Sequence, residues 1–185
     1  MSKHAHVTQL TVPVSTRDHS VGPADAPVTL VEYGDYECPY CGRAFPIVHE
    51  VRRRLGDQLR FVFRNFPLTQ IHEHAEHAAE VAEAATVQGK FWEMHDWLYT
   101  HQRTLDDDAL LEGAREIGLD VGRVQRELAE GMHRTRVRED FSSGIRSGVN
   151  GTPTFYINGV RHDADYSPDT LLSAIEQAGA AVSRP

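Results

Sequence analysis

The period of the hydrophobic positions changes twice between residues 28 and 63, and this change predicts three elements. Residues 28–33 form a short, β-branched apolar run between a proline and a glycine, which is typical of a buried strand. Apolar side chains then recur at helical spacing from Phe45 to Leu55, and Gly56 ends the run. Residues 59–63 alternate again. A strand, a helix and a strand in this order predict a βαβ unit with two parallel strands.

The next stretch, residues 72–147, shows no strand pattern. Apolar positions recur at helical spacing in five successive segments, which begin near Ala75, Phe91, Leu110, Val121 and Val137. This pattern predicts an all-helical block placed inside an α/β frame.

The α/β pattern resumes near the C-terminus. Residues 154–157 are β-branched and aromatic, and Asn158-Gly159 after them is a strong two-residue hairpin signal. Residues 160–162 are the expected return strand, and Ser167-Pro168 has the N-cap and first-turn residues of a final helix. Near the N-terminus, Leu10 to Val14 alternate and predict a short edge strand.

Composition and charge narrow the function classes. The chain has 185 residues, of which 40% are hydrophobic and 25% charged, so a globular core is expected. A net charge of -8 argues against a nucleic-acid or anionic-membrane partner. No run approaches the roughly 18 apolar residues of a membrane span, and the N-terminus lacks the apolar region of a signal peptide. We therefore expect a cytoplasmic protein, or a periplasmic or extracytoplasmic one if an export signal was removed.

The candidate chemistry lies in the two cysteines, Cys38 and Cys41, which are separated by Pro39 and Tyr40. They follow a predicted strand and open a predicted helix, where unpaired backbone N–H groups stabilise a thiolate. Their spacing places both sulfurs on one helix face. We expect Cys38, at the exposed end, to react first and Cys41 to resolve the mixed disulfide.

Two other interpretations of the pair stay open. A zinc site needs about four ligands, and the sequence has no second pair of cysteines. A structural disulfide across so short a loop constrains the chain little. His72, His74 and His77 resemble a metal cluster, but their place beside an Ala-rich helix face favours a solvent-exposed role. We assign no metal ligands.

The chain resembles the DsbA-like branch of the thioredoxin superfamily from about residue 20 to residue 180. The residues that carry the resemblance are the strand VTLVEYGDYE, the Cys38-Pro39-Tyr40-Cys41 motif, the segment from Gly151 to Phe155 and the helical insertion between them. The resemblance implies a thioredoxin-like fold: a central mixed sheet flanked by helices, with an all-helical insertion. The corresponding organisation is an N-terminal segment at 1–20, a thioredoxin-like domain at 21–69 and 149–180, an insertion at 70–148 and a tail at 181–185.

The resemblance also implies the roles of further residues. Thr152-Pro153 is expected to form a cis peptide bond beside the cysteines and to bind substrate together with Pro39 and Tyr40. Glu32 is expected to be a buried acid that takes the proton of Cys41; the alternative is an outward-facing residue at a sheet edge.

The expected activity is the exchange of the Cys38–Cys41 disulfide with protein thiols. It requires no organic cofactor, because the cysteines carry the electrons, but it requires a redox partner for recycling that the sequence does not name. Two alternatives are a glutathione-linked reductase, suggested by the glutaredoxin-like CPYC motif, and a peptide- or metal-binding module without turnover.

Overall fold

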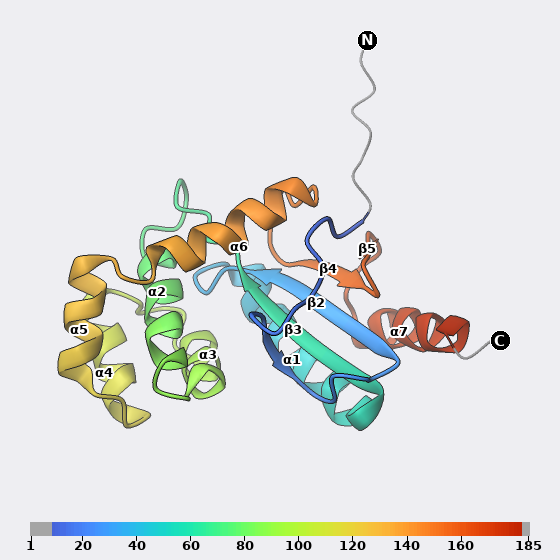
Figure 1. The fold of residues 1–185 in the computed structure, drawn as a ribbon, viewed down its shortest axis with the longest axis horizontal. Helices are drawn as coiled ribbons and strands as arrows, with labels where there is room; N and C mark the ends of the chain where they lie inside the picture. The colour runs from blue at the N-terminus through green and yellow to red at the C-terminus, as the bar shows by residue number, and fades with distance from the viewer. Residues whose placement is uncertain (1–8, 183–185) are drawn as a thin grey trace, which may run out of the picture.

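The computed structural model describes residues 9–182, and a five-stranded mixed sheet forms its centre (Figure 1). The strands lie in the order β1-β3-β2-β4-β5. Their bounds are β1 (His19–Val21), β2 (Val28–Gly34), β3 (Leu59–Asn65), β4 (Thr154–Ile157) and β5 (Val160–His162). β2 and β3 are parallel, and the other neighbouring pairs are antiparallel. The predicted βαβ unit is confirmed.

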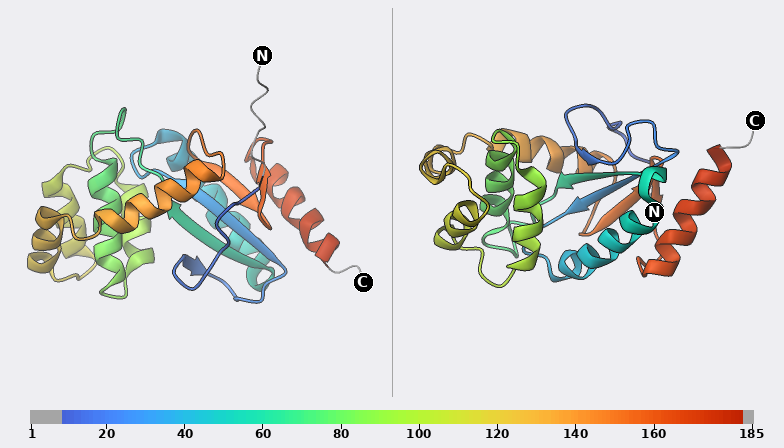
Figure 2. Two further views of the ribbon diagram at one scale, coloured as in Figure 1. Left: turned by 45° about the horizontal axis from the view of Figure 1, so that its top comes forward. Right: turned by 90° about the horizontal axis from the view of Figure 1, so that it is seen from below.

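The helices form two groups. α1 (Pro39–Leu55) and α7 (Pro168–Val182) pack on one face of the sheet, and a short 3-10 turn, η1 (Gly56–Gln58), leads from α1 into β3. The insertion consists of α2 (Ala75–Thr86), α3 (Phe91–Thr100), α4 (Asp107–Glu116), α5 (Val121–Glu130) and α6 (Arg134–Arg146). Figure 2 shows these helices gathered beside the sheet, with α6 running back across its second face. The predicted thioredoxin-like fold with a helical insertion is confirmed, while the domain boundaries stay a prediction.

The edge strand predicted from Leu10 to Val14 is wrong. Gln9 forms a single bridge with Val160 on β5, and the edge strands of the described sheet are β1, antiparallel to β3, and β5, antiparallel to β4. Leu10 and Val14 instead pack on the second face of the sheet, which explains why they alternate with polar residues. The Leu10 N–H donates to the Gly159 carbonyl at 2.8 Å, but no ladder continues from there, so the alternation reflects burial against a sheet face.

A buried arginine holds this N-terminal segment in place. Arg64, on β3, forms an ion pair with Asp18 at 2.7 Å and donates hydrogen bonds to the carbonyls of Val12 and Pro13. Its guanidinium also donates to the Tyr33 hydroxyl. The segment and α6 together cover the second face, so both faces of β2 and β3 are buried.

The hairpin predicted at Asn158-Gly159 is confirmed. Both residues have positive φ, 47° and 80°, as a two-residue turn between β4 and β5 requires. Asn158 also accepts a hydrogen bond from the backbone N–H of Thr29 through its side-chain oxygen.

The contact of α6 with the sheet depends on Gly144. A Cβ atom there would lie 2.6 Å from a ring atom of Phe66 and 3.1 Å from one of Tyr33. We expect Gly144→Ala to lower the free energy of unfolding by about 1–3 kcal/mol, because both rings are buried and must move. Gly122→Ala, at an exposed position of α5, meets only ordinary contacts at 3.6 Å and is the matched control, with an expected gain of up to about 1 kcal/mol. Equal denaturant midpoints for the two variants would contradict this packing.

Candidate active site

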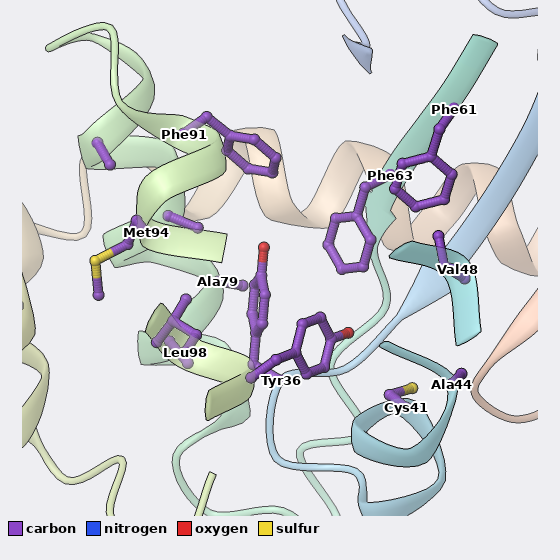
Figure 3. Packing of buried hydrophobic residues seen from close by; sticks show 14 of the residues in the cluster. Tyr36, Cys41, Ala44, Val48, Phe61, Phe63, Ala79, Phe91, Met94 and Leu98 are labelled. Atoms are coloured by element: carbon purple, nitrogen blue, oxygen red, sulfur yellow. The ribbon is translucent and has the colours of Figure 1, made fainter. Parts of the chain in front are cut away.

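The two cysteines lie at the junction between β2 and α1. Cys38 is the N-cap of α1, with extended backbone angles, and Pro39 follows as its first residue. Cys41 lies one turn further and faces the core, where Figure 3 shows it on the same side as Ala44 and Val48. Both side chains are free thiols, with 3% of Cys38 and none of Cys41 exposed. Cys38 is therefore the more accessible cysteine, although the exposed position predicted for it is largely covered.

The environment of Cys38 favours its thiolate. Its pKa is lowered to about 5, chiefly by a hydrogen bond from the Cys41 thiol, which outweighs the opposing effect of burial. The Thr152 side chain and the backbone N–H groups of Cys41 and Tyr40 lower it further. The sequence predicted that the helix terminus supplies most of this stabilisation; the structure places the Cys41 thiol first.

Cys41 has the opposite tendency. Burial raises the pKa of its thiol well above the ordinary value, and the neighbouring Cys38 and Glu32 raise it further. The backbone N–H of Asp35 donates to Cys41 Sγ at 3.5 Å and partly offsets this shift. One cysteine is thus poised as a thiolate and the other as a thiol.

Glu32 is a buried acid, with 3% of the residue exposed. Its neighbours across the sheet are Phe63 on β3 and Phe155 on β4, so it lies on a central strand and not at the sheet edge. Burial raises its pKa to about 8, with a smaller contribution from the charge of Cys38. A carboxyl group with this pKa can hold or release a proton near neutral pH.

The Thr152-Pro153 loop lies against Cys38. Its peptide bond is cis, and the Cys38 thiol donates to the Thr152 carbonyl at 3.4 Å. On the other side of the pair, Tyr40 is 56% exposed, with the Arg43 guanidinium 4.3 Å above its ring. The structure therefore brings together the residues that the sequence singled out from three separate segments.

Comparison with known proteins identifies the family. A family model described as thioredoxin matches residues 15–177. The chain belongs to the thioredoxin family. A thioredoxin-like oxidoreductase from Silicibacter pomeroyi DSS-3 is 29% identical, with a TM-score of 0.79, over 89% of this chain and 93% of that chain. The fold is also that of α-DsbA1 from Wolbachia pipientis, at 18% identity and a TM-score of 0.80, over 94% of this chain and 96% of that chain.

The curated relatives are much longer proteins. The Na(+)/H(+) antiporter NhaA 1 of Salinispora arenicola (strain CNS-205) is 47% identical over 173 residues, which are 93% of this chain and 26% of the antiporter. This thioredoxin-family chain thus spans about a quarter of the length of such relatives. Within residues 9–182, no helix combines the length and the apolar character needed to cross a bilayer.

Two of the histidines that the sequence suggested as a metal cluster each lie against a single carboxylate. His72 Nδ1 lies 2.8 Å from the Asp35 carboxylate, and His77 pairs with Asp107 on α4. Among the described residues, no three His, Cys, Asp or Glu side chains are grouped closely enough to hold a metal ion. His95 is buried and lies within hydrogen-bond distance of the Tyr36 hydroxyl.

Two residues that sequence reasoning missed touch the active-site loop. The buried carboxylate of Asp35 accepts hydrogen bonds from the backbone N–H groups of Glu37 and Leu68. Gln102, from the insertion, donates to carbonyl groups on either side of Glu37. Asp35 lies in the segment between the strand and the cysteines, and this position could have identified it as a residue of the site. Nothing in the sequence relates Gln102 to its partners, which lie more than sixty positions away.

Reactivity of Cys38 should follow the pH dependence of its thiolate. We expect alkylation of the reduced protein to accelerate as pH rises through about 5 and then to level off, because the thiolate is the nucleophile. Cys41→Ala should move this midpoint to higher pH, since the Cys41 thiol is the largest stabilising contact. Rates of iodoacetamide labelling against pH, located by peptide mapping, test both statements. A wild-type midpoint at about 8.5, as for free cysteine, would contradict them.

Proposed function

We propose that the chain is a thiol–disulfide oxidoreductase that exchanges electrons with protein thiols through a mixed disulfide on Cys38. The observation that carries the proposal is the asymmetry of the pair: Cys38, the less buried cysteine, has a lowered pKa, and the fully buried Cys41 has a raised one. A cysteine with a lowered pKa is present as the nucleophilic thiolate at neutral pH, and its thiolate is also a good leaving group.

In the oxidising direction, a substrate thiolate attacks Cys38 Sγ and breaks the Cys38–Cys41 bond. Cys41 leaves with the electron pair and takes a proton, for which the Glu32 carboxyl is the proposed donor. A second substrate thiolate then attacks the substrate sulfur of the mixed disulfide. A substrate disulfide forms and Cys38 departs as a thiolate, so two electrons have passed from the substrate to the cysteine pair.

In the reducing direction, the Cys38 thiolate attacks a substrate disulfide. Cys41 then gives its proton to the Glu32 carboxylate and attacks Cys38 Sγ, which releases the second substrate thiol. The cis Thr152-Pro153 loop is the proposed platform for an extended substrate segment, because it lies against Cys38 and leads directly into the first residue of β4. Pro39 and Tyr40, both exposed, complete the proposed contact surface.

The proposed partners are protein or peptide thiols and a separate redox partner that restores the active form. The antiporter name belongs to whole chains of which this sequence matches 26%. We therefore base the proposed activity on the cysteine site alone.

Measurement of the Cys38–Cys41 reduction potential against glutathione buffers, followed by tryptophan fluorescence, tests the proposal. A value of about -120 mV indicates an oxidant, and one of about -270 mV a reductant. If no intramolecular disulfide forms at any buffer ratio, the proposed exchange is wrong.

A further inference from the structure

Gln102 connects the helical insertion to the active-site helix. Its side-chain amide nitrogen donates to the Tyr36 carbonyl at 2.7 Å and to the Cys38 carbonyl at 3.0 Å. We propose that Gln102 is a positioning residue for the cysteine pair, which holds the first turn of α1 in place so that its N–H groups and the Cys41 thiol meet Cys38 Sγ. The inference deepens the proposed function and rests on it for its effect on exchange.

The two carbonyls that Gln102 binds belong to buried residues. Tyr36 and Cys38 are 1% and 3% exposed. A buried carbonyl without a partner is costly, so loss of the amide, and with it the hydrogen bond to the Tyr36 carbonyl, would favour a rearranged loop. The Cys38 carbonyl also accepts the N–H of Gly42, which is the first hydrogen bond of α1. The Gln102 amide therefore meets the helix at the turn that carries both cysteines.

Gly42 provides an independent indication of this contact. A Cβ atom at position 42 would lie 1.9 Å from Gln102 Oε1 and 2.8 Å from its Cδ. The backbone of Gly42 is not among the positive-φ positions, so its conformation does not itself require glycine. Glycine inside a helix costs about 0.5–1 kcal/mol relative to alanine. The approach of Gln102 explains why the smallest residue stands directly after Cys41.

The insertion holds Gln102 from the other side. Gln102 lies in a turn after α3 that is closed by a hydrogen bond from the Thr104 N–H to the His101 carbonyl at 3.0 Å. The ring of Tyr99, in the last turn of α3, lies 5.0 Å from that of Tyr36. Figure 3 shows Tyr36 between α3, with Leu98, and the Cys41 side of the core. The amide thus links two elements whose separation is already set by packing.

Gln102→Ala in the otherwise unchanged chain tests the assignment, with Arg103→Ala, at the exposed neighbouring position, as the matched control. We expect the alkylation midpoint of Cys38 to rise by about one pH unit in Gln102→Ala, a tenfold change in its thiolate equilibrium. The reduction potential should become about 30 mV more negative, which is the same tenfold factor for two electrons. Arg103→Ala should change neither.

Gly42→Ala distinguishes a specific contact of Gln102 with the first turn of α1 from a general loss of stability. The added methyl group must displace the Gln102 amide, so this variant should show the same rise in the midpoint. In the Gly42→Ala and Gln102→Ala double variant, no further rise is expected, because both substitutions remove one contact. Additive shifts would overturn the assignment, as would a Gln102→Ala protein that loses thermal stability while its midpoint stays at the wild-type value.

The alkylation measurement also separates this inference from the proposed function. Labelling of Cys38 requires no turnover and no substrate. If the wild-type pair forms no disulfide but Gln102→Ala still shifts the midpoint, the exchange activity is wrong and the positioning role stands. If the pair exchanges disulfides and Gln102→Ala leaves the alkylation midpoint of Cys38 unchanged, the positioning role is wrong and the exchange activity stands.

Discussion

Cys41→Ser is expected to accumulate a mixed disulfide between Cys38 and a disulfide-containing substrate, and Cys38→Ser is expected to form none. The Cys38 thiolate attacks the substrate disulfide in both the wild-type protein and the Cys41→Ser variant. In the wild type, Cys41 then attacks Cys38 Sγ and releases the product. A serine hydroxyl cannot perform that step, so the adduct persists.

The same pair of variants predicts the size of the rate effect. Cys38→Ser removes the nucleophile, and the second-order rate of disulfide exchange should fall by at least about a thousandfold. Non-reducing gels and intact mass spectrometry after incubation with a disulfide peptide measure the adduct. Equal amounts of adduct in the two variants would contradict the roles assigned to Cys38 and Cys41.

Glu32→Gln is expected to stabilise the reduced protein at neutral and alkaline pH. The folded chain holds the Glu32 proton up to about pH 8, whereas the unfolded chain releases it near the ordinary value of 4.5. Between these values the folded state binds more protons, so its stability falls as pH rises. Glutamine carries no charge at any pH and removes this loss, which amounts to about 3–5 kcal/mol at the upper end.

The test is urea unfolding of reduced wild type and variant at about pH 4 and about pH 8. The two proteins should differ little at the lower pH, where the carboxyl is neutral in both states, and differ most at the higher pH. Glu130→Gln, an exposed acid at the end of α5, controls for the loss of one negative charge. A stability difference that does not change with pH would contradict the buried acid.

The kinetic consequence of Glu32→Gln is a slower step at Cys41. Without the carboxylate, the buried thiol must lose its proton to water, although its pKa is well above the ordinary value. Positioned proton acceptors contribute about 10²–10⁴-fold, so the decay of the mixed disulfide should slow by a factor in this range. Formation of the mixed disulfide, measured in the Cys41→Ser background, should not slow. Equal slowing of both steps would place Glu32 outside the resolving reaction.

Local patterns were sufficient to predict most of the architecture. The period changes between residues 28 and 63 predicted β2, α1 and β3, and Asn158-Gly159 predicted the β4–β5 hairpin. These elements were predictable because turn chemistry and side-chain period act over a few residues. The prediction of a strand from Leu10 to Val14 was wrong for the same reason. A two-residue period shows that one side of a segment is buried, but not whether its backbone forms a ladder with a neighbouring strand.

The sequence by itself determined the chemical unit of this protein: two cysteines three positions apart, placed at the start of a helix that follows a strand. Only the tertiary structure decided how that unit is tuned. Glu32 is buried because it points to the face of β2 that packs on α1, the same face as Leu30 and its cross-strand neighbours Phe63 and Phe155. Gln102 reaches the Cys38 carbonyl because α3 packs against the active-site loop. Burial and long-range hydrogen bonds set pKa values, and both depend on contacts between residues that are distant in the chain.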